Sequence, residues 1–240
     1  MTDHTTHRAI TVIGATGRTG RLVVAEGLSR GLAVTALVRD ASRMPAHLPS
    51  HEPSHEPSHE HGPRVVAGDL DDPDAVRRSL DGSSAVVVAA GVRYRGRHPW
   101  SGIAGRRDVV PAAVRALCTH ATPLTRVILL SAVGAAESWR ELPAPVRWLI
   151  ASSSLRVSYA GLTEAERLLT ASGLPHTVVR AVRLTDGPPT GAEVDATGRP
   201  LRGNPRVARA DLARMLVDLA LAGPGPGWVT HRVAAAGAGG

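Results

Sequence analysis

The stretch AITVIGATGRTGRLVVAEGLSR, residues 9–30, carries the strongest structural signal in the chain. It opens with five apolar or β-branched residues, a pattern typical of a strand buried in a parallel sheet. A glycine-rich turn follows, and helical spacing of apolar residues then runs from Thr19 to about Arg30, ended by Gly31. The stretch therefore predicts a strand, a tight turn and a helix in direct succession.

The turn contains three glycines, Gly14, Gly17 and Gly20. A dinucleotide-binding turn needs glycine where the chain bends, where a pyrophosphate approaches the backbone, and where the helix crosses the strand. The N–H groups that open the following helix, with the positive end of its dipole, then face the phosphates. The spacing and its surroundings predict that this turn binds a dinucleotide.

Strands and helices continue to alternate along the chain. Further strands are predicted at 33–38, 64–67, 85–90, 126–130 and 177–181. Helices are predicted at 73–80, with Asp72 as N-cap and Pro73 as first residue, and at 106–120, 159–171 and 209–221. This order predicts an α/β fold: one Rossmann-like domain over residues 1–240, with a doubly wound parallel sheet and helices on both faces.

One segment departs from this pattern. Residues 49–60 repeat the tetrapeptide PSHE three times. Proline at every fourth residue excludes a helix or a central strand, and the repeat offers nothing apolar to bury. We therefore expect a disordered His- and Pro-rich insert at 45–63, although its histidines and glutamates also allow weak transition-metal binding. The end of the chain, 234–240, is predicted to be a flexible tail.

Composition limits the other function classes. The chain has no Lys, so its 28 basic residues are all Arg, and its net charge is +7. These arginines are scattered and only 2% of residues are aromatic, which argues against a nucleic-acid surface and leaves an anionic cofactor or an Arg-rich codon bias as explanations. With no Phe in 240 residues, the core must be aliphatic.

The single cysteine, Cys118, excludes an intramolecular disulfide and a cysteine-based metal cluster. Its place in a helical pattern predicts a small buried side chain. No metal site is expected, and no apolar run approaches the roughly 18 residues that cross a bilayer. The first ten residues lack the layout of a signal peptide, so a cytoplasmic protein is expected.

The choice of cofactor depends on the end of the second strand. That strand ends in Arg39, with Arg43 one turn later. Guanidinium groups suit the doubly charged 2′-phosphate of NADP(H), whereas a carboxylate there would favour NAD. Asp40 argues the other way, because a different turn would aim it at the ribose. The sequence favours NADP(H).

Two more segments fall at the carboxyl ends of predicted strands. Asp69 and Leu70 follow the third strand and are placed to border the adenine ring, although Asp69 also suits a simple turn or cap. Ala89, Ala90 and Gly91 close the fourth strand with small residues, which lets the backbone approach a cofactor.

Candidates for chemistry are few. Ser131 ends the fifth strand, where a doubly wound sheet places its ligands, and either binds or relays a proton or caps the backbone. Tyr159 has no cation nearby in the sequence, so it suits hydrogen bonding or packing better than acid catalysis. The loop Arg93–Trp100 holds three arginines and two aromatics, which fits either a solvated loop or a mouth for a planar, anionic substrate.

The stretches VIGATGRTG, VTALVRDASRMP and VVAGDLDDPDAV resemble the atypical short-chain dehydrogenase/reductase group, which includes NmrA-like and NAD(P)H-binding proteins. With ASGLPHTVVRAVRLTDGPPTGAEV and RVARADLARMLVDL, the chain looks most like the flavin reductase/biliverdin-IXβ reductase branch. The resemblance implies that the turn glycines, Thr16, Arg18 and Thr19 hold the pyrophosphate. It also implies that Arg39 and Arg43 hold the 2′-phosphate, and that Ser131 and the loop 91–97, with Arg93, lie by the nicotinamide.

The chain also departs from that group. Ordinary short-chain dehydrogenases pair Tyr with Lys four residues later, but here Thr163 follows Tyr159 at that spacing, so Tyr–Lys acid catalysis is excluded. Glu166 stands where the flavin reductase branch has a histidine near the substrate. That branch also works without the Tyr–Lys pair, by direct hydride transfer to a stacked flat acceptor.

These observations favour an NADPH-dependent oxidoreductase whose small-molecule substrate is a flat conjugated acceptor such as a flavin, quinone or tetrapyrrole. Two alternatives stay open: an NADP(H)-binding redox sensor without turnover, and a non-redox cyclase or isomerase of secondary metabolism on the same fold. No nucleic-acid or membrane partner is expected, and the protein is expected to be a monomer or homodimer.

Overall fold

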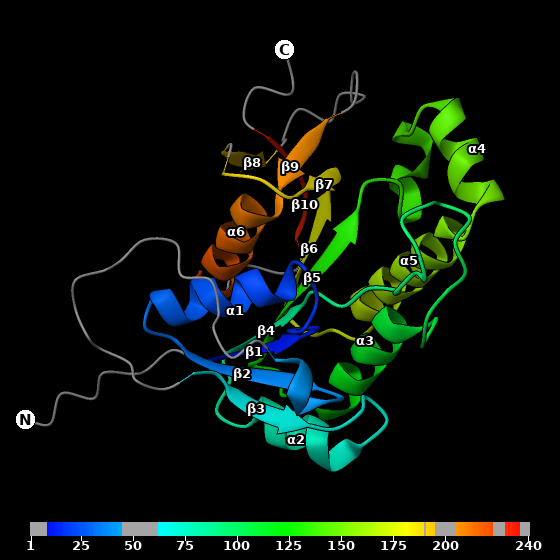
Figure 1. Ribbon diagram of the computed structural model, residues 1–240. Helices are drawn as coiled ribbons and strands as arrows, with labels where there is room; N and C mark the ends of the chain where they lie inside the picture. The colour runs from blue at the N-terminus through cyan, green and yellow to red at the C-terminus, as the bar shows by residue number, and fades with distance from the viewer. Residues whose placement is uncertain (1–8, 45–61, 190, 195–204, 223–228, 236–240) are drawn as a thin grey trace, which may run out of the picture.

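The computed structural model describes residues 9–44, 62–189, 191–194, 205–222 and 229–235 (Figure 1). Its main sheet has the strand order β3-β2-β1-β4-β5-β6-β10-β8, in which every neighbouring pair is parallel except β10 and β8. The strands are β1 (Ala9–Ile13), β2 (Ala33–Val38), β3 (Arg64–Ala67), β4 (Ala85–Val88), β5 (Arg126–Ala132), β6 (His176–Ala181), β8 (Ala192–Val194) and β10 (Val229–Ala235). The order of the first six is that of dinucleotide-binding folds, and the predicted fold class is confirmed.

Helices cover both faces of the sheet. Helices α1 (Gly20–Ser29) and α6 (Arg209–Leu221) lie together on one face, and α2 (Pro73–Leu80), α3 (Val109–His120) and α5 (Leu155–Ala171) lie on the other (Figure 1). Strand β1 shows why: Ile10 and Val12 pack with α1 and α6, whereas Ile13 packs with α2 and α3. Alternate side chains of a strand point to opposite faces, so one buried strand supplies two aliphatic cores.

Helix ends follow side-chain chemistry. Asp72 accepts hydrogen bonds from the N–H groups of Asp74 and Ala75, and Pro73 follows it, so the start of α2 is as predicted. Helix α3 begins at Val109, later than expected, and Arg106 and Asp108, which precede it, pair with each other. Helix α5 begins at Leu155, four residues before the predicted Tyr159. Strand β4 ends at Val88, two residues early.

Several elements were not predicted. They are the 3₁₀ turns η1 (Ala41–Arg43) and η2 (Ala136–Glu141), helix α4 (Ala144–Ser152), the small parallel pair β7 (Arg183–Thr185) and β9 (Arg206–Ala208), and strands β8 and β10. Strand β10 includes Ala234 and Ala235, so the predicted tail is wrong for these two residues. Residues 236–240 and most of the predicted insert, 45–61, lie outside the described residues. Cys118 is exposed, not buried as predicted.

No helix in the part of the chain that the structure describes has both the length and the apolar character needed to span a bilayer.

Candidate functional site

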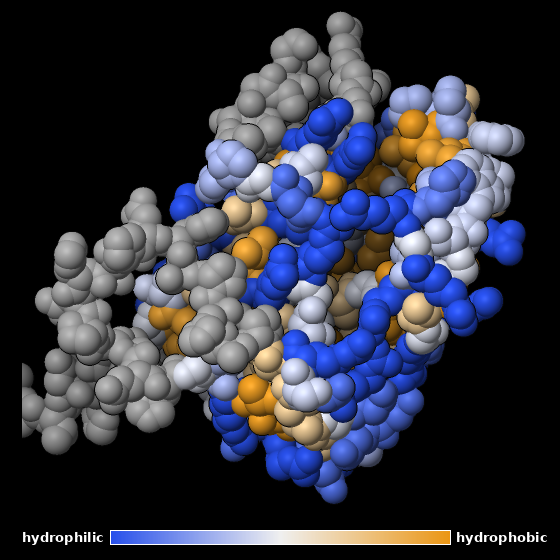
Figure 2. Space-filling model, viewed as in Figure 1, coloured by the Kyte–Doolittle hydropathy of each residue, from blue (hydrophilic) through white to orange (hydrophobic). Residues whose placement is uncertain are grey.

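The sheet reverses its winding between β1 and β4, which pair side by side while β2 and β5 flank them. In open α/β sheets, ligands bind beyond the carboxyl ends of the strands at such a switch point. Figure 2, viewed as Figure 1, shows the surface hollowed in front of the carboxyl end of β5, with apolar residues visible between polar ones. The predicted cofactor turn opens onto this edge.

The glycine turn is built so that side chains would not fit at two of its three glycines. Gly14 has a φ of +90°, and a Cβ there would lie 2.6 Å from the nitrogen of Ala90. A Cβ on Gly20 would collide with the carbonyl oxygen of Gly14. At Gly17 the nearest atom would be that same oxygen at 3.1 Å. The turn therefore bends at Gly14, packs its helix at Gly20, and leaves the most room for a side chain at Gly17.

The start of α1 suits an anion. Thr19, its N-cap, is buried but makes no side-chain cap hydrogen bond. The N–H groups of Arg21 and Leu22 donate to the backbone carbonyls of Gly17 and Thr19, whereas the N–H of Gly20 has no partner among the described residues. Thr16 and Arg18 are exposed beside it. The residues present therefore fit the pyrophosphate of a dinucleotide.

Four guanidinium groups gather around this turn. Burial and the positive charges of Arg209, Arg97 and Arg21 lower the pKa of Arg18. Arg209 begins α6, and its pKa is also lowered, by burial and by Arg21. The carboxylate of Asp186 contacts both Arg18 and Arg209. Among the residues that the structure describes, Asp186 is the one acid paired with these four arginines, which leaves the turn electropositive.

At the end of β2, Asp40 and Arg39, the residues that favour NAD and NADP(H) respectively, have different surroundings. Asp40 caps η1: its side chain accepts from the Ser42 backbone N–H at 3.0 Å and from the Ser42 hydroxyl at 2.6 Å. These hydrogen bonds lower the pKa of Asp40. Arg43 lies 3.9 Å from the same carboxylate, and Arg39 is exposed without an ion-pair partner among the described residues.

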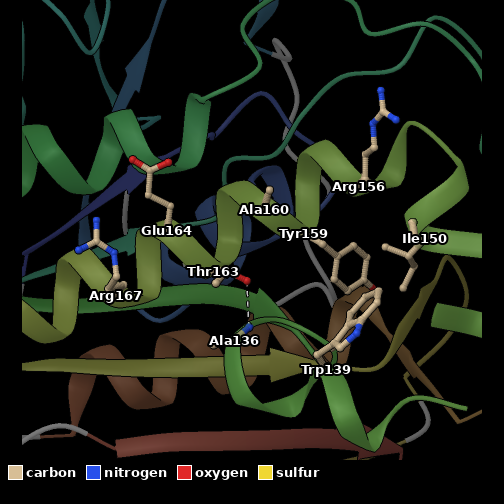
Figure 3. Close-up of a pocket in the computed structure, with 11 residues that line it drawn as sticks. Ala136, Trp139, Ile150, Arg156, Tyr159, Ala160, Thr163, Glu164 and Arg167 are labelled. Atoms are coloured by element: carbon tan, nitrogen blue, oxygen red, sulfur yellow. Dashed lines mark hydrogen bonds between the residues drawn. The ribbon is translucent and has the colours of Figure 1, made fainter. Parts of the chain in front are cut away.

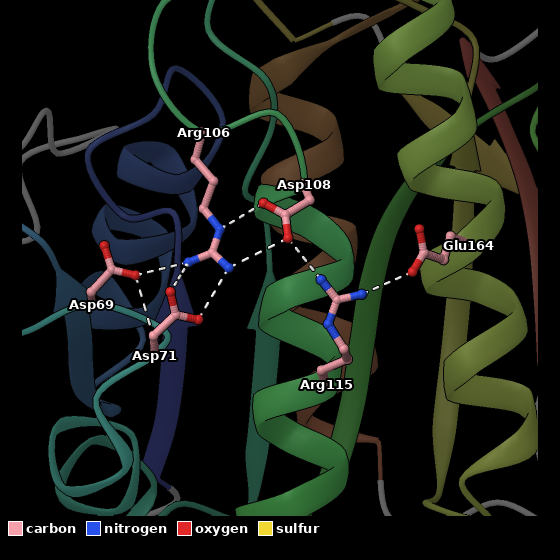
Figure 4. A network of polar contacts seen from close by, with 6 residues as sticks. All are labelled: Asp69, Asp71, Arg106, Asp108, Arg115 and Glu164. Carbon is pink, nitrogen blue, oxygen red and sulfur yellow. Dashed lines mark hydrogen bonds and ion pairs between the residues drawn. The ribbon is translucent and has the colours of Figure 1, made fainter.

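Asp69 belongs to a network of ion pairs that joins the loop after β3 to helices α3 and α5 (Figure 4). Arg106 donates to Asp69 at 3.0 Å, to Asp71 at 2.7 Å and to Asp108 at 2.8 Å. Arg115 on α3 continues the chain from Asp108 to Glu164 on α5. Hydrogen bonds to Asp71 and Asp108 raise the pKa of Arg106. Asp69 is therefore held by its neighbours, with Leu70 packed against the core beside it.

Ser131 lies at the end of β5 within a buried polar cluster. Its hydroxyl donates to Glu166 of α5, which Arg180 of β6 also contacts, at 2.5 and 3.2 Å. Ser131, Glu166 and Arg180 are only 5%, 4% and 7% exposed. Arg180 further holds Glu137 of η2 at 2.6 and 2.9 Å. Glu166, which stands where the flavin reductase branch has a histidine, is thus the hydrogen-bond partner of Ser131.

Tyr159 does not join this cluster. It precedes Glu166 by two turns of α5, about 10 Å along the axis. Its neighbours are Gly134 and Trp139, whose ring centroid lies 6.4 Å away at an interplanar angle of 70°. Burial raises the pKa of Tyr159, so it stays protonated, and its hydroxyl has no hydrogen-bond partner among the described residues.

Tyr159 also lines a surface cavity of about 780 Å³ between η2, α4 and α5. Figure 3 shows its ring beside Trp139 and Ile150, while Thr163 accepts from the backbone N–H of Ala136 at 2.9 Å. The two candidate catalytic residues therefore occupy separate environments: Ser131 a charged cluster and Tyr159 an aromatic cavity wall.

The loop after β4 is a small hairpin over residues 93–104, closed by an antiparallel bridge between Tyr94 and Ile103. Its aromatic side chains attach it to the helices opposite: Tyr94 bonds to Ser158 and Trp100 donates to the carbonyl of Ser152 at 3.0 Å. Arg93 and Arg97 remain exposed. Ala89, Ala90 and Gly91, which precede the hairpin, lie at the switch point, where Ala89 and Ala90 approach Gly14.

Arg180, Glu137 and Asp186 are site residues that the sequence analysis missed. The signal for Arg180 was an arginine inside an otherwise apolar strand, since arginine is almost never fully buried unless paired. Glu137 and Asp186 lie on segments predicted without structure, so no periodicity drew attention to them.

Known proteins are similar to this chain over most of its length. A family described as NAD(P)H-binding matches residues 14–222. An uncharacterized chloroplastic protein of Arabidopsis thaliana is 29% identical over an alignment of 197 residues that covers 77% of this chain and 62% of that protein. This chain thus spans less than two thirds of the length of that relative.

Solved structures share the fold at low identity. A short-chain dehydrogenase/reductase from Veillonella parvula, in complex with NADP, has a TM-score of 0.70 at 20% identity, with 96% of both chains covered. An anaerobilin reductase from Escherichia coli also has a TM-score of 0.70, at 19% identity, covering 95% of this chain and 98% of that one. Since the family match covers most of the sequence and agrees with the resemblance seen there, this chain belongs to the NAD(P)H-binding family.

Proposed function

We propose that the protein is an NADPH-dependent reductase that passes a hydride to a flat conjugated acceptor such as a flavin, quinone or tetrapyrrole. The observation that carries this proposal is the glycine turn at the β1–β4 switch point, with four arginines around it. The turn supplies backbone N–H groups and the arginines supply positive charge. Together they match a pyrophosphate.

The choice of NADPH over NADH rests on Arg39. Its guanidinium is exposed and without an ion-pair partner among the described residues, so it is available to a 2′-phosphate. Asp40, the residue that would favour NADH, is occupied with Ser42 and Arg43. A ribose hydroxyl would therefore have to displace these existing contacts of Asp40.

When bound, the nicotinamide supplies the hydride. The residues of this chain would bind and orient the dinucleotide and exclude water from it. The switch point would align the dinucleotide along the sheet edge, and the hairpin 93–104 borders that edge. Tyr159, protonated and without a hydrogen-bond partner among the described residues, is placed to donate a hydrogen bond into the aromatic cavity. Arg97 adds positive charge that would attract an anionic acceptor.

A second candidate function is cofactor binding without turnover. It is favoured by the Ser131 hydroxyl, whose proton is already donated to Glu166, and by the raised pKa of Tyr159, which makes that residue a weak acid. Neither side chain readily gives up a proton. A sensor needs no proton donor, whereas an enzyme that protonates its substrate does.

The test is a fluorescence titration with NADPH and NADH, followed in the same cuvette by a flavin and a simple quinone. A reductase should bind NADPH more tightly and lose nicotinamide absorbance when an acceptor is added. Tight binding with no loss for any acceptor would favour the sensor or a non-redox enzyme. If neither nucleotide binds, the proposed function is wrong.

A further inference from the structure

Ser131 lies in line with the cofactor turn along the sheet edge. Leu129 of β5 pairs with Val88 of β4, and two residues further on the strands reach Ser131 and Ala90. Ala90 is the residue whose backbone approaches Gly14 in the turn. The carboxyl edge therefore runs from Gly14 through Ala90 to Ser131, which is the direction a dinucleotide takes when it leaves the switch point.

The charges around Ser131 fix the direction of its hydrogen bond. Arg180 is permanently charged and donates two hydrogen bonds to Glu166, 2.5 and 3.2 Å long. Both carboxylate oxygens of Glu166 accept hydrogen bonds from Arg180, and one of them also accepts from the hydroxyl of Ser131. An ionised carboxylate can only accept hydrogen bonds. The proton between Ser131 and Glu166 therefore comes from Ser131.

A serine hydroxyl has one proton and two lone pairs. Because the proton of Ser131 is committed to Glu166, only lone pairs remain for a ligand at the sheet edge. Ser131 is thus a hydrogen-bond acceptor at this site. It is poorly suited to give a proton to a reduced substrate, since the proton would have to be replaced from a carboxylate that carries none.

We infer that Glu166 and Arg180 are positioning residues that make Ser131 an acceptor for the carboxamide N–H of the bound nicotinamide. The carboxamide is the only group on that ring that carries an N–H, so it is the only part of the ring that an acceptor oxygen can bind by a conventional hydrogen bond. The inference rests on the proposed function, because it assumes that an NADP(H) nicotinamide reaches the end of β5.

The test compares binding of NADP+ with that of its 3-acetylpyridine analogue, in which an acetyl group replaces the carboxamide and no N–H is present. Wild type should bind NADP+ roughly five- to tenfold more tightly, the worth of about one hydrogen bond. Ser131→Ala should lose that preference, and the variant is expected to fold because Glu166 keeps both hydrogen bonds from Arg180. Ser79→Ala, which removes a buried hydroxyl of α2, is the matched control and should keep the preference.

Glu166→Gln tests the positioning role. Arg180 has only donors, so it should take the amide oxygen and leave the amide N–H facing Ser131. Ser131 would then accept from the glutamine and turn its own proton to the ligand, which should remove the preference for the carboxamide and improve binding of the acetyl analogue. Thermal unfolding checks that the variant is folded.

The outcomes separate the two proposals. If wild type binds neither nucleotide, the proposed function fails. If wild type binds both equally, or if Ser131→Ala keeps the preference, the role of Ser131 is overturned while NADP(H) binding stands. If Ser131→Ala loses the preference but folded Glu166→Gln keeps it, the role of Glu166 is overturned.

Discussion

Arg18 of the glycine turn is ion-paired with Asp186, which follows β7 and lies far from it in sequence. The carboxylate stands among the same guanidinium groups that a pyrophosphate would use, since it also contacts Arg209. The structure therefore contains its own anion at the proposed phosphate site.

Asp186→Asn should increase the affinity for NADPH, because the protein anion no longer competes with the phosphates. Both partners are more than half exposed, so the gain should be modest, about two- to fivefold at low salt and smaller at high salt. Titration at two salt concentrations measures it. Asp218→Asn removes an equal charge at the other end of α6 and should change nothing; an equal gain there would mean that only net charge matters.

Arg39→Ala should weaken NADPH binding by at least tenfold, about 1.4 kcal/mol, and leave NADH binding nearly unchanged. The reason is that only NADPH carries the 2′-phosphate that Arg39 is proposed to hold. Arg77→Ala, which removes an exposed arginine from α2, is the control. Equal losses for both nucleotides at position 39 would contradict the assignment.

Two glycines of the turn should respond differently to alanine. Gly20→Ala places a Cβ against the carbonyl of Gly14 and should destabilise the fold by about 1–3 kcal/mol, because backbone must move. Gly17→Ala meets that oxygen only at 3.1 Å, so it should unfold close to the wild-type temperature yet bind NADPH at least tenfold more weakly. Thermal unfolding and titration together distinguish them. A fully stable Gly20→Ala variant would contradict this packing.

Tyr159→Phe should leave NADPH binding unchanged and lower kcat with an acceptor by about tenfold. The substitution keeps the ring against Trp139 and removes a hydroxyl that no described residue binds. The loss is expected to be modest because the raised pKa of Tyr159 makes it a hydrogen-bond donor and not a strong acid. Steady-state kinetics measures it, and an unchanged kcat would place Tyr159 outside the chemistry.

Glu137 should make stability depend on acid pH. Hydrogen bonding to Arg180 lowers its pKa below the usual glutamate value, so the folded state holds the ionised form. The contribution is complete above the unfolded pKa of about 4.3, and it is lost as the pH falls through the lower folded pKa. Denaturant unfolding between about pH 3 and 6 should therefore show a steeper acid loss in wild type than in Glu137→Gln. Identical slopes would show that the pair adds no stability.

The local parts of the fold were predictable from the sequence. The strand at Ala9–Ile13 and the helix after the glycine turn depend on neighbouring residues, and both lie where the pattern placed them. Strand β10 was missed because it follows a run of Gly and Pro and has mixed polarity, although it pairs with β6 inside the sheet. Helix α4 was missed because Pro143 and Pro145 flank its first residue and interrupt the helical pattern there.

The site was harder to predict because its contacts join distant segments. Ser131 could be placed at a strand end, but its direction of hydrogen bonding depends on Glu166 and Arg180, from two other elements. Asp40 could be recognised as ambiguous, whereas its capping of η1 became visible only in three dimensions. A polar side chain often has two plausible partners. Packing in three dimensions, and not the spacing of residues in the sequence, decides which one it binds.

The guanidinium groups around the turn have one more consequence. Arginine does not lose its proton in proteins, so the guanidinium groups at the phosphate site stay charged from acid to alkaline conditions. A phosphate monoester takes up its second proton at about pH 6, where the guanidinium groups do not titrate. The 2′-phosphate would therefore change its charge near that pH while the guanidinium charges that face it stay constant.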